Sequence, residues 1–367
     1  MFLRPESTIE EGDNVNKTSK DFLGKLLKES SPSGYENSAA AVWRGYAEKF
    51  SHEVKGDFHG NSYATLNPQG KVSVYMSGHI DEIGFMVKSI TEAGFLKISP
   101  VGGIDPHVVA GQRVYVYTTK GPIYGVLGRK AIHLLEAEER KKVTQIKDMW
   151  IDIGVKDKKE AEKLVEIGDV ATIAVGFEKL RGSVYVARGF DDRIGAFAVV
   201  EALRLLSLEK NFKHKVTSVA SVQEEIGVRG AITSSYNVNP QIGFAVDVTH
   251  TSDMPGIDKD LFGDIKLGDG PVIARGPNIN PRLFELLVKT AEENKIPYKV
   301  IAESRGTGTD ANAIQLARGG VATALVSIPN RYMHTPVEVV SLDDVENTAK
   351  LLAKTIAAIK SEKDFII

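Results

Sequence analysis

The sequence predicts an α/β protein in which a mostly parallel sheet is sandwiched by helices and a small β-rich barrel or sandwich is inserted. Three observations lead to this fold class. Strand-like and helix-like segments alternate in the later part of the chain, after residue 182. Between residues 84 and 182 the pattern changes to short β-type runs separated by glycine, proline or charged residues. The length of 367 residues suits two domains, or one large domain that carries an insertion.

These observations also predict how the chain is divided. We expect a flexible arm over residues 1–17, because this stretch is polar and acidic. The main α/β domain is expected to combine residues 18–83 with residues 183–367, and residues 84–182 are expected to form the inserted domain.

Composition narrows the class of partner. The 46 basic and 48 acidic residues give a net charge of −2, so we expect no general attraction to nucleic acid or to an anionic membrane. The absence of cysteine excludes disulfides, thiol nucleophiles and cysteine-based zinc sites. No apolar run approaches the roughly 18 residues of a membrane span, and the start of the sequence lacks the apolar core of a signal peptide. The sequence therefore predicts a cytoplasmic protein.

The segment before residue 84 begins with helical patterns and ends with strands. Residues 21–27 begin a helix, and the turn at residues 31–34 leads into a longer helix over residues 36–50. Extended runs follow at residues 52–66 and 71–77, separated by a proline- and glycine-containing turn.

The inserted segment is predicted to consist of short strands. Its β-type runs, the last of which lies just past the insertion, are residues 85–90, 95–98, 113–118, 123–128, 150–153, 170–175 and 183–186. One helical pattern covers residues 158–166, and the charged stretch at 136–147 is interpreted as a solvated face or loop. Short strands at this spacing favour a small barrel or sandwich.

After residue 189, helices and strands alternate again. The predicted helices are residues 194–206, 229–234, 281–294, 310–317 and 343–359. The predicted strands are residues 215–223, 242–247, 298–303 and 322–327. This alternation predicts parallel strands joined by helices.

Histidines and carboxylates collect where the predicted strands end, which is where open α/β sheets bind their ligands. The residues placed at this edge are His79, Asp81, Asp191, Asp192, Glu224, Glu225, Asp247 and His334. Grouped carboxylates repel one another, and divalent cations are the usual partners that relieve the repulsion. Histidine and carboxylate ligands without cysteine suit zinc, cobalt or manganese in a catalytic site. Five such ligands that share one bridging carboxylate would hold two ions, as in two-metal hydrolases.

Several of these residues have simpler explanations when they are considered alone. Asp191 is then a helix N-cap, and the pair Glu224 and Glu225 is a solvated strand end. His250 competes as a ligand because it follows Asp247 closely. The glycine-rich residues 305–310 lack the lysine of a P-loop, so we interpret them as a loop that lines the site. No Gly-x-Ser-x-Gly elbow occurs, and the sequence therefore offers no such serine nucleophile.

Five motifs of the chain resemble those of the tetrahedral aminopeptidases, a family of co-catalytic metallopeptidases whose members are also labelled deblocking aminopeptidases or cellulase-like. The motifs are residues 77–85 (SGHIDEIGF), 190–195 (FDDRIG), 222–231 (VQEEIGVRGA), 247–250 (DVTH) and 331–338 (RYMHTPVE). They occur in the family's order, and the resemblance extends over residues 22–359.

The resemblance implies an aminopeptidase that removes N-terminal residues from short peptides with two divalent metal ions per subunit, zinc first and cobalt or manganese as alternatives. In the family pattern, one metal is held by His79 and Asp247, the other by Glu225 and His334, and both by the bridging Asp191. Glu224 would be the general base, and Asp81 the carboxylate behind His79. Asp192 stands where many members carry asparagine, which leaves Asp192 as an alternative bridge; we prefer Asp191.

The resemblance further implies a homo-oligomer. The inserted domain would form dimers, and the dimers would assemble into hollow tetrahedral dodecamers with the active sites inside.

Other functions compete with this expectation. The same site could deacylate small amino-acid derivatives. A glycosidase is disfavoured, because neighbouring glutamates on one segment are poorly placed to flank a sugar with carboxyls roughly 5–9.5 Å apart. A shell-forming scaffold without activity is a further alternative. The sequence does not give the preferred N-terminal residue, for which Arg275, Arg331 and residues 254–260 are candidate determinants.

Overall fold

The computed structural model describes residues 16–367. Most of the arm predicted over residues 1–17 lies outside this range. Its last two residues already belong to a helix, because Asn16 caps α1 (Lys17–Lys28) by accepting a hydrogen bond from the Ser19 N–H.

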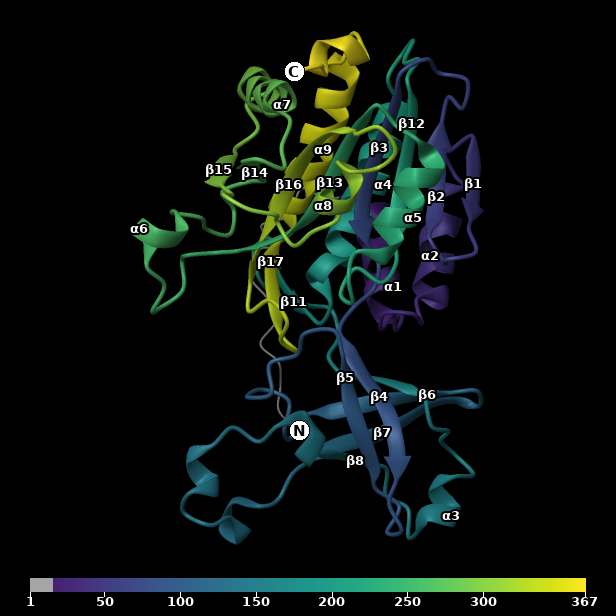
Figure 1. Ribbon diagram of the computed structural model, residues 1–367, viewed down its shortest axis with the longest axis vertical. Helices are drawn as coiled ribbons and strands as arrows, with labels where there is room; N and C mark the ends of the chain where they lie inside the picture. Colours follow the sequence, from purple (N-terminus) through teal and green to yellow (C-terminus); the bar gives the residue numbers. More distant parts are fainter. Residues whose placement is uncertain (1–15) are drawn as a thin grey trace.

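Within the described residues, the strands form an eleven-stranded mixed sheet and a separate closed barrel (Figure 1). The strands of the sheet are β1 (Glu53–Gly56), β2 (Ser62–Leu66), β3 (Ser73–His79), β10 (Glu178–Arg181), β11 (Val184–Ala187), β12 (Lys215–Ser221), β13 (Ile242–His250), β14 (Val272–Arg275), β15 (Lys299–Ala302), β16 (Ala322–Arg331) and β17 (Glu338–Ser341). The central strands β12, β3, β13 and β16 are parallel neighbours, which confirms the predicted α/β class. The strands toward both edges are antiparallel.

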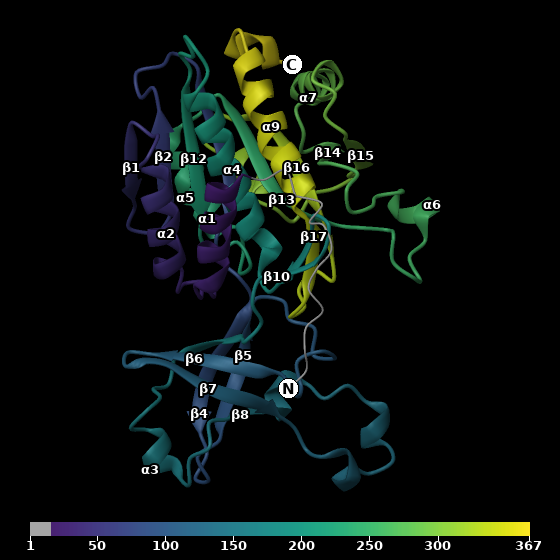
Figure 2. The same ribbon diagram turned by 180° about the vertical axis from the view of Figure 1, so that it is seen from behind.

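Helices cover both faces of this sheet, as Figures 1 and 2 show from opposite sides. One face packs against α1, α2 (Asn37–Ala47), α4 (Phe190–Ser207), α7 (Pro281–Glu293) and α9 (Leu342–Ala358), and the other against α5 (Arg229–Val238) and α8 (Ala311–Ile314). Alternate residues of β3 point to opposite faces: Val74 and Met76 join the larger core, whereas Tyr75 joins the core under α5 and α8. The short helix α6 (Lys259–Phe262) projects from the body of the domain.

The barrel confirms the β-rich insertion. Its strands are β4 (Gly84–Ile90), β5 (Leu96–Val101), β6 (Arg113–Thr118), β7 (Gly121–Gly128), β8 (Trp150–Asp152) and β9 (Val170–Ile173). They enclose a core of their own, and the charged residues 136–147 lie in a largely exposed loop, as predicted. The loop carries η1 (Ile132–Leu134), η2 (Glu139–Lys141) and η3 (Ile146–Asp148), and α3 (Lys158–Ala161) follows β8. β10, near the end of the predicted insertion, pairs with β11 in the main sheet.

Two links connect the barrel to the main sheet, and a buried ion cluster lies at the first of them. Glu82 precedes β4, and Arg188 follows β11. The Glu82 carboxylate pairs with Arg188 and, at 3.2 Å, with Arg193. All three side chains are less than a tenth exposed. The cluster therefore fixes the start of α4 relative to the entry into the barrel.

Within residues 16–367, none of the helices combines the length and the apolar character that a membrane crossing requires. The chain closes with a short 3₁₀ turn, η4 (Glu362–Phe365).

Candidate functional site

Six of the predicted site residues meet in one cavity of about 570 Å³ at the carboxyl ends of the parallel strands. They arrive on separate elements: His79 ends β3, Asp247 lies in β13, and Glu224 and Glu225 follow β12. Asp191 lies at the start of α4, and His334 lies between β16 and β17. All six of these side chains line the cavity.

The Asp191 carboxylate lies between the two histidines. Its Oδ1 atom is 3.1 Å from His79 Nε2, and its Oδ2 atom is 3.1 Å from His334 Nε2. Asp191 belongs to two groups of potential metal ligands. Within each group, the ligand atoms all lie within 4.8 Å of one another. One group adds His79 and Asp247, and the other adds Glu225 and His334.

Asp192 faces a different way. Its carboxylate accepts hydrogen bonds of 3.1 Å from the N–H groups of His79 and Gly195. It is fully buried and holds the backbone at the end of β3 against the first turn of α4.

Asp81 does more than stand behind His79. The His79 Nδ1 atom is 3.1 Å from the Asp81 carbonyl oxygen and 3.4 Å from its carboxylate. The carboxylate accepts hydrogen bonds from the N–H groups of Glu224 at 3.0 Å and Glu225 at 3.2 Å. It also accepts from Ser33 Oγ at 2.6 Å. Asp81 thus joins the β3 end to the Glu224-Glu225 turn.

The Glu224-Glu225 turn has the backbone that its position at a strand end requires. Gln223 adopts a left-handed conformation with φ 56°, and Gly227 has φ 122°, a value that glycine tolerates. The Glu224 carboxylate reaches within 3.9 Å of His79 Nε2. Both glutamates therefore face the same cavity, although their side chains would lie on opposite faces of a continued strand.

The electrostatics of the cavity favour a cation. Burial raises the pKa of Glu224 to about 9 and that of Asp247 to about 7, because neighbouring carboxylates add to the cost of charging each group. Burial also raises the pKa of Glu225, whose Oε1 atom is buried without a hydrogen-bond partner. A divalent ion satisfies such an oxygen and relieves the repulsion, so these histidine and carboxylate donors fit two metal ions.

Three residues that contribute to the site were not foreseen. Glu338, in β17, accepts hydrogen bonds from the N–H groups of Asp191 and His334. It belongs to the RYMHTPVE motif, four residues after His334, and this spacing was the only available signal. Gly102 and Gly103, after β5 of the barrel, approach Glu225 and His334, and no sequence pattern connects them with the site.

The remaining candidates divide into two groups. His250 and the loop residues Thr307, Gly308 and Thr309 line the cavity, which agrees with the predicted site-lining loop. Among the described residues that line it, neither arginine candidate nor residues 254–260 occur. Arg331 instead pairs with Asp253, and Arg275 lies over the ring of Phe284.

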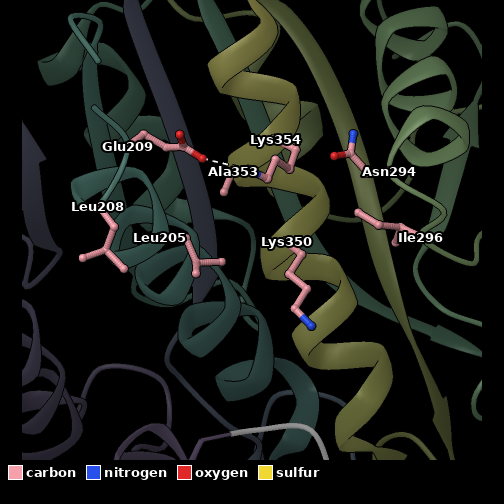
Figure 3. Close-up of a pocket in the computed structure, with 8 residues that line it drawn as sticks. All are labelled: Leu205, Leu208, Glu209, Asn294, Ile296, Lys350, Ala353 and Lys354. Atoms are coloured by element: carbon pink, nitrogen blue, oxygen red, sulfur yellow. Dashed lines mark hydrogen bonds and ion pairs between the residues drawn. The ribbon is translucent and has the colours of Figure 1, made fainter. Parts of the chain in front are cut away.

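A second groove, between α4, α7 and α9, lies away from these residues (Figure 3). Leu205, Leu208 and Ile296 form much of its wall. Its two lysines already have partners: Lys354 pairs with Glu209 at 2.8 Å, and Lys350 pairs with Glu346 at 2.7 Å. The groove therefore lacks the uncompensated charges that distinguish the strand-end cavity.

Comparison with known proteins agrees with this geometry. The family model described as M42 glutamyl aminopeptidase matches residues 60–351. The chain belongs to the M42 glutamyl aminopeptidase family. This M42 enzyme is therefore a peptide hydrolase, which confirms the resemblance seen in the five motifs.

Individual M42 relatives match nearly the whole enzyme. It is 36% identical to the lysyl aminopeptidase of Pyrococcus furiosus over 343 residues, 93% of this chain and 97% of that protein. The TET aminopeptidase of a marine sediment archaeon of the Thaumarchaeota has a similar structure, with a TM-score of 0.89, 34% identity and coverage of 95% of this chain and 98% of that one. The TET1 peptidase of Pyrococcus horikoshii can assemble into a tetrahedron or a large octahedral shell. Its structure matches with a TM-score of 0.81 and 33% identity, and the match covers 92% of this chain and 98% of that one.

Proposed function

We propose that this enzyme is a two-metal aminopeptidase that removes N-terminal residues from short peptides. The observation that carries the proposal is the position of the Asp191 carboxylate, with one oxygen toward His79 and the other toward His334. A bridging carboxylate between two ligand sets is the arrangement of two-metal hydrolases.

The residues present define the two ligand sets. His79, Asp191 and Asp247 would hold one ion, and Asp191, Glu225 and His334 the other. Asp191 is preferred to Asp192 as the bridge because the Asp192 carboxylate is already occupied by backbone N–H groups. Zinc is the first expectation and cobalt or manganese the alternatives, because the donors are imidazole and carboxylate. Ions of this kind polarise a scissile carbonyl and lower the pKa of a water molecule.

Glu224 is the proposed general base. Its carboxylate lines the cavity, and the hydrogen bond from its own N–H to Asp81 fixes its backbone. It would take a proton from the attacking water and deliver it to the leaving amine. The cations proposed beside it would lower its pKa toward the range that this transfer needs.

We propose the family's assembly for this chain as well, with the barrel as the dimer-forming domain and twelve subunits as the final state. The assembly of the Pyrococcus horikoshii peptidase into a tetrahedron supports this proposal. A sizing column with light scattering tests it, and a chain that stays monomeric at micromolar concentration would contradict it. The cytoplasmic location inferred from the sequence also stays a prediction.

Glu224→Gln tests the mechanism. The variant keeps the size and shape of the side chain but cannot accept the proton, so we expect kcat to fall by about 10²–10⁴-fold. Metal content per chain, measured by mass spectrometry of the purified protein, should stay at the wild-type value of two ions.

The substrates are a panel of aminoacyl reporters with and without an N-acyl group, each assayed with zinc, cobalt and manganese. Turnover of N-acyl substrates alone would favour a deacylase instead. If Glu224→Gln keeps more than about a tenth of the wild-type rate, Glu224 is not the base.

A further inference from the structure

Glu338 occupies an unusual place beside the site. Its side chain is 1% exposed, and it lies at the start of β17. Its Oε2 atom accepts a 2.9 Å hydrogen bond from the Asp191 N–H, and its Oε1 atom accepts a 3.1 Å bond from the His334 N–H. One carboxylate therefore holds the backbones of two proposed ligands that reach the site on different segments.

Sheet register explains how Glu338 reaches both backbones. β17 pairs with β11 so that Glu338 lies opposite Ala187, and the chain continues from Ala187 directly into the Asp191 turn. On the other side, Glu338 follows His334 by four positions along the chain. The segment that leads to Glu338 contains two residues in left-handed conformations, Tyr332 with φ 60° and His334 with φ 61°. Such conformations cost non-glycine residues about 1–2 kcal/mol each and persist only where other contacts hold them.

We infer that Glu338 is a positioning residue that sets the distance between Asp191 and His334 and thereby the affinity of the ligand set made by Asp191, Glu225 and His334. This inference rests on the proposed two-metal function. Glu338 is not among the described residues that line the cavity, and each of its oxygens accepts a backbone N–H group. It acts on His334 and Asp191 as Asp81 acts on Glu224 and Glu225.

Glu338→Gln is the variant that separates this role from simple folding. A glutamine has one acceptor oxygen, so one of the two N–H bonds is lost while the volume is kept. Loss of an outer partner of a ligand commonly weakens metal binding about 10–100-fold. We expect this loss in a calorimetric titration of the metal-stripped full chain with Mn²⁺. At saturating Mn²⁺, kcat should recover substantially, and KM for an aminoacyl reporter should not change.

Asp344→Asn is the matched control. Asp344 is also a fully buried carboxylate that accepts two backbone hydrogen bonds, from the N–H groups of Gly268 and Gly270 at 2.8 Å each. It is not among the described residues that line the cavity. The control should lower thermal stability without changing Mn²⁺ affinity.

The outcomes distinguish this inference from the proposed function. If wild type binds Mn²⁺ and folded Glu338→Gln binds it equally well, the positioning role is wrong and the proposed function stands. If the wild-type protein itself binds no Mn²⁺, both the proposed function and this inference are wrong. If Glu338→Gln does not fold, amide hydrogen exchange of the metal-free wild-type protein is the deciding measurement. The inference predicts slow exchange of the Asp191 and His334 amides. Fast exchange at both amides would overturn it.

Discussion

At the scale of single residues, Gly78 shows how closely the site depends on packing. It precedes His79 in β3, and a Cβ atom added to it would lie 2.3 Å from the Gly195 carbonyl carbon and 2.4 Å from the Ala196 nitrogen. The backbones of β3 and α4 are thus in direct contact. This contact brings the His79 N–H within reach of the Asp192 carboxylate.

Gly78→Ala should therefore disturb both the fold and the site. We expect a loss of about 1–3 kcal/mol in the free energy of unfolding, since the methyl group has only backbone to displace. Activity of the remaining folded protein should also fall, because His79 must move with the strand. Chemical denaturation and a reporter assay measure the two effects.

Gly45→Ala is the control for that substitution. Gly45 lies in α2, and an added Cβ would meet no atom within 4 Å. Alanine in a helix interior should increase stability by about 0.5–1 kcal/mol and leave activity unchanged. An equal change in unfolding free energy for the two variants would show that the close contact at Gly78 does not affect stability.

Sequence reasoning could find the site residues that lie at strand ends. His79, Asp81, Asp247 and the glutamate pair follow directly from the predicted strands. In the structure His79, Asp247 and the two glutamates line one cavity, and Asp81 contacts His79 and the glutamate backbone. Glu338 could not be found this way. Its partners are backbone N–H groups, which every residue except proline carries, so nothing in the sequence distinguishes them.

At the scale of elements, the ion cluster of Glu82, Arg188 and Arg193 links β4, β11 and α4. Glu82→Gln leaves two buried guanidinium groups without their carboxylate. We expect a loss of about 3–5 kcal/mol in unfolding free energy, measured by urea denaturation at pH 7. Glu92→Gln removes the exposed pair with Lys158 in the barrel and should cost at most about 1 kcal/mol. A similar loss in both variants would contradict the importance of burial.

The effect of Glu82 should depend on pH. Burial alone would raise its pKa, but the charges of Arg188 and Arg193 outweigh burial and hold the pKa below the ordinary value. The ionised group is thus favoured in the folded state. Its stabilisation is fully present above the unfolded pKa of about 4.3 and is lost as the pH falls through the lower folded pKa. The difference between wild type and Glu82→Gln should shrink in the same acidic range.

Element prediction succeeded for the long helices and the parallel strands, and it missed some of the short elements. α4 and α9 and the parallel strands were predicted within a few residues. The extended run at residues 52–66 is instead a hairpin of β1 and β2, because the Asp57 carboxylate accepts three successive N–H groups and turns the chain. The helix expected at residues 158–166 is limited to α3. β10, β14 and β17 have four residues each and were not predicted, although β9, β11 and β15, which are equally short, were.

At the scale of the whole molecule, the barrel is not independent of the site. Gly103 lies against His334, and a Cβ atom at Gly103 would lie 3.2 Å from His334 Nδ1. Gly102 has φ 76°, and its Cβ would lie 3.2 Å from the Cβ of Glu225. The loop after β5 therefore forms part of the site wall, although it belongs to the inserted segment.

Gly103→Ala changes a residue of the inserted segment and should weaken metal binding. The methyl group pushes on His334, and we expect Mn²⁺ affinity to fall by about tenfold with little change in thermal stability. Gly176→Ala, in the other link between the domains, meets no atom within 4 Å and should behave as wild type. Unchanged affinity in Gly103→Ala would show that the loop adjusts without moving the histidine.

The division of the chain into a parallel sheet and an inserted barrel was predictable because it rests on patterns that extend over many residues. The contact between Gly103 and His334 was not, since it depends on how two separately folded units are oriented, and hydrophobic periodicity carries no information on that orientation.

The carboxylates of Asp81 and Glu338 both accept hydrogen bonds from main-chain N–H groups of proposed site residues. The scaffold of the site is thus chemically separate from the groups that it presents. A substitution at Glu225 or His334 alters the donor atom while the backbone keeps its anchor. In the proposed two-metal centre, such an architecture would let a single substitution change the metal preference without a new fold for the centre.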